Sequence, residues 1–189
     1  MRTGRMIMVA AAALTLATGC SNSPSASPTS SPEAHAGVTQ EELCNSLMAF
    51  FSGELQAVDL GSVAFLGKDT IISPSGSCTI TNSQTQRSNG RFEIHQAPND
   101  PTPIENRKKF FVETTEMGKT VWVWDWRTDL GNPTPQVVFA TRIGEWNSEL
   151  QIEENTTQTA SGVLHLTDEN KHKAAQFLLE LTKRIVDAQ

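Results

Sequence analysis

The sequence predicts an α+β domain: an antiparallel sheet packed on one face by N-terminal, middle and C-terminal helices. Three well-separated segments place apolar residues at helical spacing. Between them lie segments in which apolar and polar residues alternate, as they do in half-buried strands. Short turns link these strands, and no regular strand–helix–strand alternation runs through the chain. Neighbouring strands are therefore expected to pair in antiparallel fashion.

The first helix is expected to begin at Thr39. Glu42 follows three residues later, which completes a capping-box pattern. Gly53 is expected to end or weaken the helix. Its apolar face consists of Leu43, Leu47, Phe50 and Phe51. Cys44 lies beside this face, so a covalent partner for it is expected to come from the sheet.

A β-hairpin is predicted over residues 77–97. Its first strand, 77–83, alternates with Cys78 and Ile80 on the inner side. Asn89-Gly90 is a hairpin-turn signal, and residues 91–95 then form the second strand with Phe92 and Ile94 buried. The preceding runs 63–66 and 70–72 are short and ambiguous between strand and loop.

A middle helix is predicted over Ile104–Thr115, with Pro103 near its first position and Gly118 after its end. Strict alternation predicts a strand over Thr120–Trp126.

Two further strands are predicted, over 137–143 and 148–153. A final helix, capped by Thr167 or Asp168, follows a polar loop. Its apolar stripe consists of Ala174, Phe177, Leu178, Leu181 and Ile185.

The N-terminus has the features of an export signal. A basic start, Met1–Arg5, precedes an apolar run, Met6–Ala17, that is too short to span a bilayer. Ala17-Thr18-Gly19-Cys20 then resembles the lipobox of bacterial lipoproteins, with Ala17 at the aliphatic position. The resemblance implies cleavage before Cys20 and a diacylglyceryl group on its sulfur. The other interpretation is ordinary cleavage after Gly19, which would release a soluble chain with a free N-terminal thiol.

Three parts of the chain follow from this interpretation. Residues 1–19 are the lipoprotein signal peptide, residues 20–36 are the lipidated Cys20 and a disordered Ser/Pro tether, and residues 37–189 are a single extracytoplasmic domain. The tether after Cys20 contains six Ser and three Pro and no large apolar residue, so it lacks the surface needed to fold. As a flexible coil it spans about 20–24 Å.

Two cysteines remain once Cys20 is assigned to lipid attachment. Cys44 and Cys78 form an even pair in an exported chain, where disulfides persist. A disulfide between them is therefore predicted, with two buried free thiols as the alternative. Their spacing does not match a zinc site, because no C-x₂-C motif or accompanying His pair is present.

Charge and motif content exclude several classes of function. Arg2 and Arg5 leave with the signal peptide, so 13 of the 15 basic residues face 21 acidic ones, a net charge of −8. Such a chain is not expected to bind nucleic acid or to be held electrostatically on anionic lipid. The four His are scattered, and neither a metal-binding nor a catalytic motif is present. No metal or cofactor is expected, and the domain is predicted not to be an enzyme.

A row of tryptophans is the candidate ligand-binding feature. Trp122, Trp124 and Trp126 fall on one face of the predicted strand. They would either face the helices as core or line a surface for a sugar, an acyl chain or an apolar partner. The adjoining Arg127 would clamp a carboxylate or phosphate, or lie solvated at the strand end.

The whole layout is similar to that of small cell-envelope lipoproteins of actinobacteria. The similarity rests on Cys20, Cys44, Cys78 and the final helix, and it implies localisation on the outer face of the cell membrane through the lipid on Cys20. The leading hypothesis is a non-enzymatic binding or accessory module for an envelope lipid, a glycan or a partner protein. An envelope hydrolase with a dispersed active site and a structural subunit of a membrane complex are the alternatives.

Overall fold

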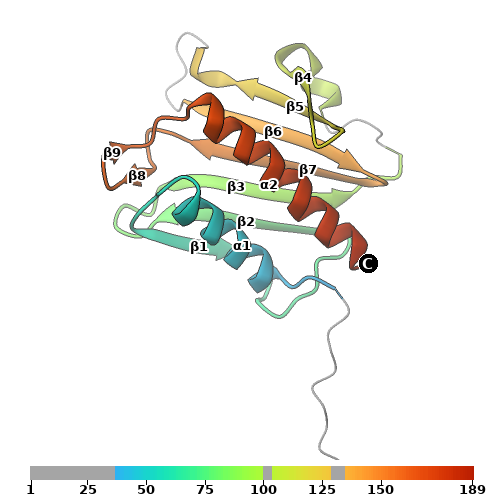
Figure 1. Ribbon diagram of the computed structural model, residues 1–189. Helices are drawn as coiled ribbons and strands as arrows, with labels where there is room; N and C mark the ends of the chain where they lie inside the picture. The colour runs from blue at the N-terminus through green and yellow to red at the C-terminus, as the bar shows by residue number, and fades with distance from the viewer. Residues whose placement is uncertain (1–36, 100–103, 129–134) are drawn as a thin grey trace, which may run out of the picture. The chain divides into compact units, whose positions relative to one another are not determined.

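The computed structural model describes residues 37–99, 104–128 and 135–189. The predicted signal peptide, Cys20 and the tether therefore lie outside the described residues. The described part contains two α-helices and a seven-stranded antiparallel sheet, which confirms the α+β class (Figure 1). The helices are α1 (Gln40–Gly53) and α2 (Asp168–Asp187).

The strands of the large sheet lie in the order β1-β2-β3-β7-β6-β5-β4. Their bounds are β1 Leu60–Ala64, β2 Ser75–Asn82, β3 Ser88–Gln96, β4 Val112–Glu116, β5 Lys119–Asp125, β6 Gln136–Ile143 and β7 Trp146–Glu153. A second, two-stranded sheet pairs β8 (Gln158–Thr159) with β9 (Gly162–Val163).

Two blocks of consecutive strands meet at one long-range pairing. Strands β1 to β3 pair in chain order, and so do β4 to β7. β3 joins the blocks by pairing with β7, which places Phe92 opposite Leu150. Residues directly opposite each other point to the same face of a sheet. The pairing therefore makes the two blocks share one apolar face.

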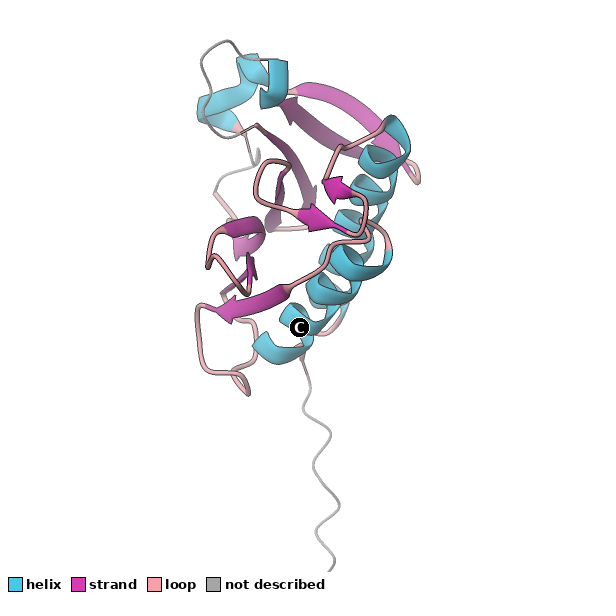
Figure 2. Cartoon of the chain, turned by 90° about the vertical axis from the view of Figure 1, so that its left-hand side faces the viewer, coloured by secondary structure: helices cyan, strands magenta, loops and turns pink. Residues whose placement is uncertain are grey.

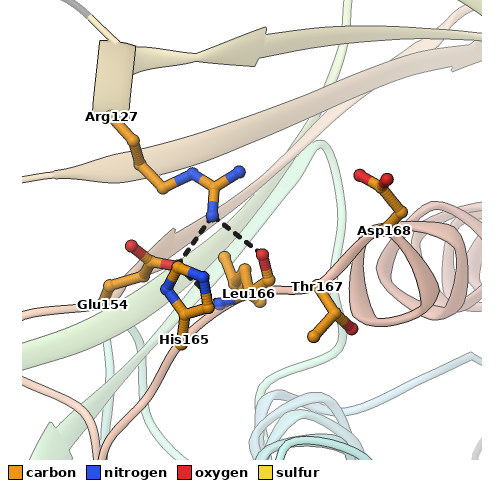
Figure 3. Close-up of a pocket in the computed structure, with 6 residues that line it drawn as sticks. All are labelled: Arg127, Glu154, His165, Leu166, Thr167 and Asp168. Carbon is orange, nitrogen blue, oxygen red and sulfur yellow. Dashed lines mark hydrogen bonds and ion pairs between the residues drawn. The ribbon is translucent and has the colours of Figure 1, made fainter.

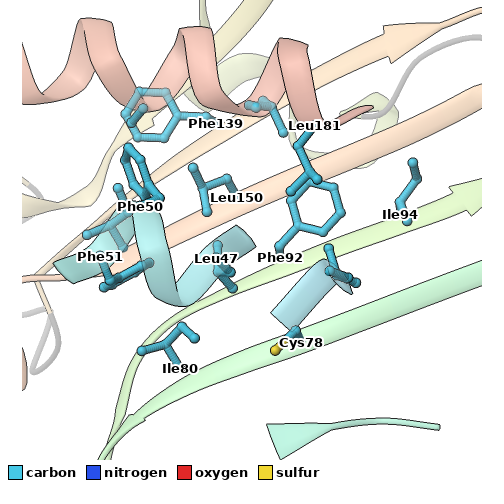
Figure 4. Packing of buried hydrophobic residues seen from close by; sticks show 14 of the residues in the cluster. Leu47, Phe50, Phe51, Cys78, Ile80, Phe92, Ile94, Phe139, Leu150 and Leu181 are labelled. Atoms are coloured by element: carbon cyan, nitrogen blue, oxygen red, sulfur yellow. The ribbon is translucent and has the colours of Figure 1, made fainter. Parts of the chain in front are cut away.

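That shared face carries a row of side chains across all seven strands. The directly paired positions are Ala64, Cys78, Phe92, Leu150, Phe139, Val123 and Val112. Cys78, Phe92, Leu150 and Phe139 are completely buried. They form the centre of the main core, into which Leu47 of α1 and Leu181 of α2 project (Figure 4).

Both helices lie on this face of the sheet (Figure 2). A capping box begins each one, Thr39 with Glu42 in α1 and Thr167 with Asn170 in α2. The predicted Thr39–Glu42 box is confirmed, and Thr167 is the cap of the final helix. Phe50 of α1 stacks on Phe177 of α2, with ring centroids 4.3 Å apart, so the two helices also contact each other.

A disulfide joins the first helix to the sheet, as predicted. Cys44 of α1 is bonded to Cys78 of β2, and their Cα atoms are 5.4 Å apart. Both residues are buried, with 5% and 0% of their surface exposed. The bond therefore closes a 34-residue separation inside the main core rather than at the surface.

The predicted middle helix is wrong. Residues Glu105–Phe110 form a short 3-10 helix, η1, and after Phe111 the chain enters β4. The Val112-Glu113-Thr114-Thr115 run is rich in β-branched residues, which favour strands. Met117 and Gly118 both have positive φ, 50° and 71°, and form the two-residue turn between β4 and β5. Gly118 therefore turns a hairpin and does not end a helix.

The predicted β2–β3 hairpin is confirmed, but its turn lies elsewhere. The loop spans residues 83–87, and Asn82 Oδ1 accepts hydrogen bonds from the amides of Gln84 and Thr85. Gly90 lies inside β3, where an added Cβ would clash with the Gln151 carbonyl oxygen and lie 2.5 Å from the Phe51 ring. This glycine permits a close approach and does not form the turn.

We expect loss of the disulfide to destabilise the domain by about 3.5–4 kcal/mol, because the unfolded chain gains the freedom of an open loop. The comparison is between wild type and Cys44→Ala/Cys78→Ala in urea denaturation, each with and without reductant. Reductant should lower the free energy of unfolding of the wild type and leave that of the double variant unchanged. Equal stability of the two oxidised proteins would contradict the expectation.

Candidate functional site

The tryptophan row lies on the face of the sheet opposite the helices. Trp124 is 8% exposed and packs in a second core with Ile104, Phe111, Val138 and Ala140. Phe110 stacks on its indole with ring centroids 4.6 Å apart. The expectation that a buried row would face the helices is therefore wrong: η1 covers it from the other side.

Trp126 departs from the predicted strand. It begins a second 3-10 helix, η2 (Trp126–Thr128), and its ring meets that of Trp124 edge-on, 4.1 Å between centroids. Trp122 and Trp126 are half-buried against the second core. Trp124 is thus a packing residue, and only the outer edges of Trp122 and Trp126 remain for a ligand.

Arg127 is the centre of a network of ion pairs at one end of the sheet. Its Nε and one terminal nitrogen donate to the two carboxylate oxygens of Asp125, at 2.7 and 2.6 Å. The other terminal nitrogen donates to Glu154 Oε1 at 2.9 Å and to the Leu166 carbonyl oxygen at 2.8 Å (Figure 3). Lys171 of α2 also lies 3.8 Å from Asp125. The network ties the end of β5 to β7 and to the start of α2.

The charges of this network support one another. The Arg127 guanidinium lowers the pKa of Asp125 through hydrogen bonds and charge attraction. The two carboxylates in turn raise the pKa of Arg127. The hydrogen bonds to Asp125, Glu154 and Leu166 use four of the five N–H groups of the Arg127 guanidinium. A ligand carboxylate or phosphate would have to displace them, so the predicted clamp role of Arg127 gives way to a structural one.

An open hollow of about 540 Å³ lies beside this network. Its lining consists of Arg127, Glu154, the segment 165–167 and the first residue of α2, Asp168. The His165 imidazole is 3.7 Å from Glu154 but its side chain is 85% exposed. The hydroxyl of Thr167 caps α2. Arg127, Glu154 and Thr167, which line this hollow, thus already form hydrogen bonds within the domain.

A different surface is left uncovered on the helix-free side. We call open face the outward side chains of β2, β3 and β7, namely Ser77, Thr79, Arg91, Glu93, His95 and Gln151. Register places Thr79, Arg91 and Gln151 in one row across these strands. η1 covers the neighbouring strands and is held there by an ion pair from Arg107 to Glu149. The open face begins where that cover ends.

The open face contains a hollow of about 220 Å³ at the end of β1. Phe65, Ser75, Ser77, Arg91, Glu93 and His95 contribute to its lining. Arg91 and Glu93 form an ion pair in which each side chain is nearly half exposed. The sequence carried a signal for this surface, because Arg91, Glu93 and His95 alternate with buried Phe92 and Ile94. The sequence alone did not show that Phe65, Ser75 and Ser77 lie on the same surface, because their position depends on how the strands pair.

The described residues contain no group of three or more His, Cys, Asp or Glu side chains that could hold a metal ion. Within the same ranges, no helix has both the length and the apolarity needed to cross a bilayer.

No protein-family model and no curated protein matches the chain. Among solved structures it is similar to protein CV1439 from Chromobacterium violaceum, with a TM-score of 0.20 and 10% identity over 79% of this chain and 91% of that one. A likeness of this size carries no argument about fold or function.

We expect Trp124→Ala to lower the free energy of unfolding by about 3–4 kcal/mol, because it empties the centre of the second core. Val112→Ala, in the adjacent strand and 71% exposed, is the matched control, for which we expect a change below about 0.5 kcal/mol. Urea denaturation measures both. A loss for Trp124→Ala no larger than that of the control would show that the indole is a surface residue.

Arg127→Gln should destabilise the domain by about 2 kcal/mol at neutral pH, because it removes the guanidinium that donates to two partly buried carboxylates, Asp125 and Glu154. The lowered pKa of Asp125 means that its contribution is present above its unfolded pKa, about 3.9, and is lost as the pH falls through the folded pKa. The difference from wild type should therefore shrink in acid. Thermal unfolding across pH measures it, with the exposed Arg87→Gln as control. A difference that stays constant into strong acid would contradict the ion-pair account.

Proposed function

We propose that the chain is an extracytoplasmic lipoprotein, anchored by acyl chains on Cys20, whose folded domain is a non-enzymatic module that binds a partner protein. The observation that carries the binding role is the open face, a part of the sheet that no described helix covers. The localisation part rests on the lipobox resemblance and on the disulfide, which is typical of proteins outside the reducing cytosol.

The character of the open face favours a protein partner over a lipid. It combines an ion pair, two hydroxyls, an amide and an imidazole with one aromatic rim residue, Phe65. Lipid sites are enclosed and mostly apolar, whereas the hollow here is shallow and mixed in character. Polar rims around a few apolar residues are typical of protein interfaces.

A hydrolase is less well supported by the same surface. A general base needs a hydrogen bond to the group it activates. His95 shares the hollow with Ser75 and Ser77, but it is exposed to solvent. Glu93 is already paired with Arg91. The arrangement thus supports binding better than acyl transfer.

Mass spectrometry of the protein isolated from membranes tests the anchoring. We expect a mature chain that starts at Cys20 and carries a diacylglyceryl group, because the signal ends in a lipobox-like sequence. Cys20→Ser should abolish the added mass. An unmodified Cys20 at the mature N-terminus would remove the membrane assignment.

Site-specific photo-crosslinking in the producing cell tests the binding. A crosslinking residue at Thr79, in the middle of the open face, should yield one discrete adduct, whereas the same residue at exposed Ser161 in the β8–β9 turn should not. Arg91→Glu should reduce the Thr79 adduct about tenfold by reversing a rim charge. Equal adducts from both sites, or no effect of Arg91→Glu, would count against the open face as the binding surface.

A further inference from the structure

An apolar patch is concentrated at the end of β1. Three of the large apolar side chains that are exposed in the described chain lie within four consecutive residues: Val63, Phe65 and Leu66 are 58%, 78% and 37% exposed. We call them the β1 patch. Phe65 is the most exposed of all the large apolar residues described. Clusters of exposed apolar side chains commonly mark sites that contact a protein or a membrane, so the β1 patch is a candidate contact surface.

The loop that presents the patch is held firmly. The amide of Phe65 donates to the Ser77 carbonyl oxygen at 3.3 Å, and the amide of Thr70 donates to the Gly67 carbonyl oxygen at 2.9 Å. The amides of Gln40 and Glu41, at the start of α1, donate to Thr70 and Lys68 carbonyl oxygens, both at 2.9 Å. The Phe65 ring therefore projects from a loop whose backbone is held by hydrogen bonds to α1 and β2.

The same loop lies where the tether enters the domain. Thr39 forms a β-bridge with Ile71, and the Ile72 amide donates to the Val38 carbonyl oxygen at 2.9 Å. Gly37 has φ +123°, and an added Cβ would lie only 2.6 Å from Ile71 Cγ2, so the chain enters tightly against this loop. The lipid-bearing Cys20 is therefore connected to the end of the domain that carries the β1 patch.

We propose that the β1 patch is a membrane contact: Phe65 and Leu66 insert into the interface of the bilayer that holds the anchor. This inference rests on the anchoring in the proposed function. Sixteen residues separate Cys20 from Gly37, and each residue spans at most about 3.5 Å, so the patch stays within about 60 Å of the anchored cysteine and meets the bilayer at a high effective concentration. A contact too weak to recruit a free protein is then sufficient to orient a tethered one.

The charges around the β1 patch are nearly balanced, so the interaction with the bilayer is expected to come from the apolar side chains. Lys68 lies 3.8 Å from Glu41, and Asp69 is its neighbour in the chain. On the open face beside the patch, Arg91 is paired with Glu93. Positive and negative groups are thus nearly balanced around the patch, and the contact is expected to form on zwitterionic lipid without help from anionic headgroups.

Insertion of the β1 patch would also orient the open face relative to the bilayer. Phe65 also lines the edge of the open-face hollow. Insertion of this edge would hold the open face at the membrane surface, facing along it toward partners that are embedded in or attached to the same bilayer. The class of partner becomes a membrane-associated protein.

Fluorescence quenching in vesicles tests the contact. Acylated Phe65→Trp protein is reconstituted into phosphatidylcholine vesicles with and without brominated acyl chains. The four native tryptophans are present in every variant, so subtraction of the wild-type signal isolates the added indole. Acylated Val163→Trp, on β9 and 53% exposed, is the matched control. The Val58 amide donates to the Gln158 carbonyl oxygen, so the β8–β9 sheet is joined to the segment before β1, whereas Phe65 follows the other end of that strand.

We expect the added emission of Phe65→Trp to fall about twofold or more in brominated vesicles, as it should for an indole about 5–10 Å deep in the interface, and that of Val163→Trp to stay unchanged. Addition of phosphatidylglycerol should not increase the quenching. Lack of quenching at position 65, or equal quenching at both positions, would overturn the proposal. A dimer crosslinked through the β1 patch together with unquenched Phe65→Trp would assign the patch to a second copy instead. Failure of the wild type to sediment with the vesicles would refute the anchoring rather than the contact.

Discussion

The pairing of β3 with β7 is the interaction on which the rest of this domain depends. Each block of strands on either side of it is built from neighbours in the chain and is local in origin. β3 ends at Gln96 and β7 begins at Trp146, so this pairing closes a long stretch of chain and costs the most loop entropy. Once Phe92 lies opposite Leu150, the apolar row continues from β1 to β4. Neither helix would otherwise have a complete surface to cover.

The two faces of this sheet then acquire different roles. α1 and α2 cover one face, and the Cys44–Cys78 bond fixes α1 to it from within the core. On the other face, η1 and the tryptophans form a smaller second core over part of the sheet only. The polar open face lies beyond the edge of this cover. The binding role proposed for it therefore follows from incomplete coverage rather than from a catalytic or metal-binding group.

Local signals in the sequence predicted much of this fold. Thr39 with Glu42 marked the first helix correctly, and alternation marked most of the strands. The prediction of a middle helix was wrong because Phe110 and Phe111 fit a helical stripe as well as they fit a 3-10 helix followed by a strand. Alternation also placed Trp122 and Trp124 together without revealing which face the helices would cover, because Val121 and Val123 make the other face apolar too. The hollow beside Phe65 combines residues of β2 and β3 with the residue that follows β1, and only the register between the strands brings them together.

Native-state hydrogen exchange of the backbone amides tests the central role of the β3–β7 pairing most directly. If this pairing makes one cooperative sheet, the amides of Ile80 in β2 and Phe139 in β6 should exchange with the same free energy, equal to that of global unfolding. If the two blocks instead open with clearly different free energies, each is a separate unit, and the account of a single sheet organised by β3 and β7 is wrong.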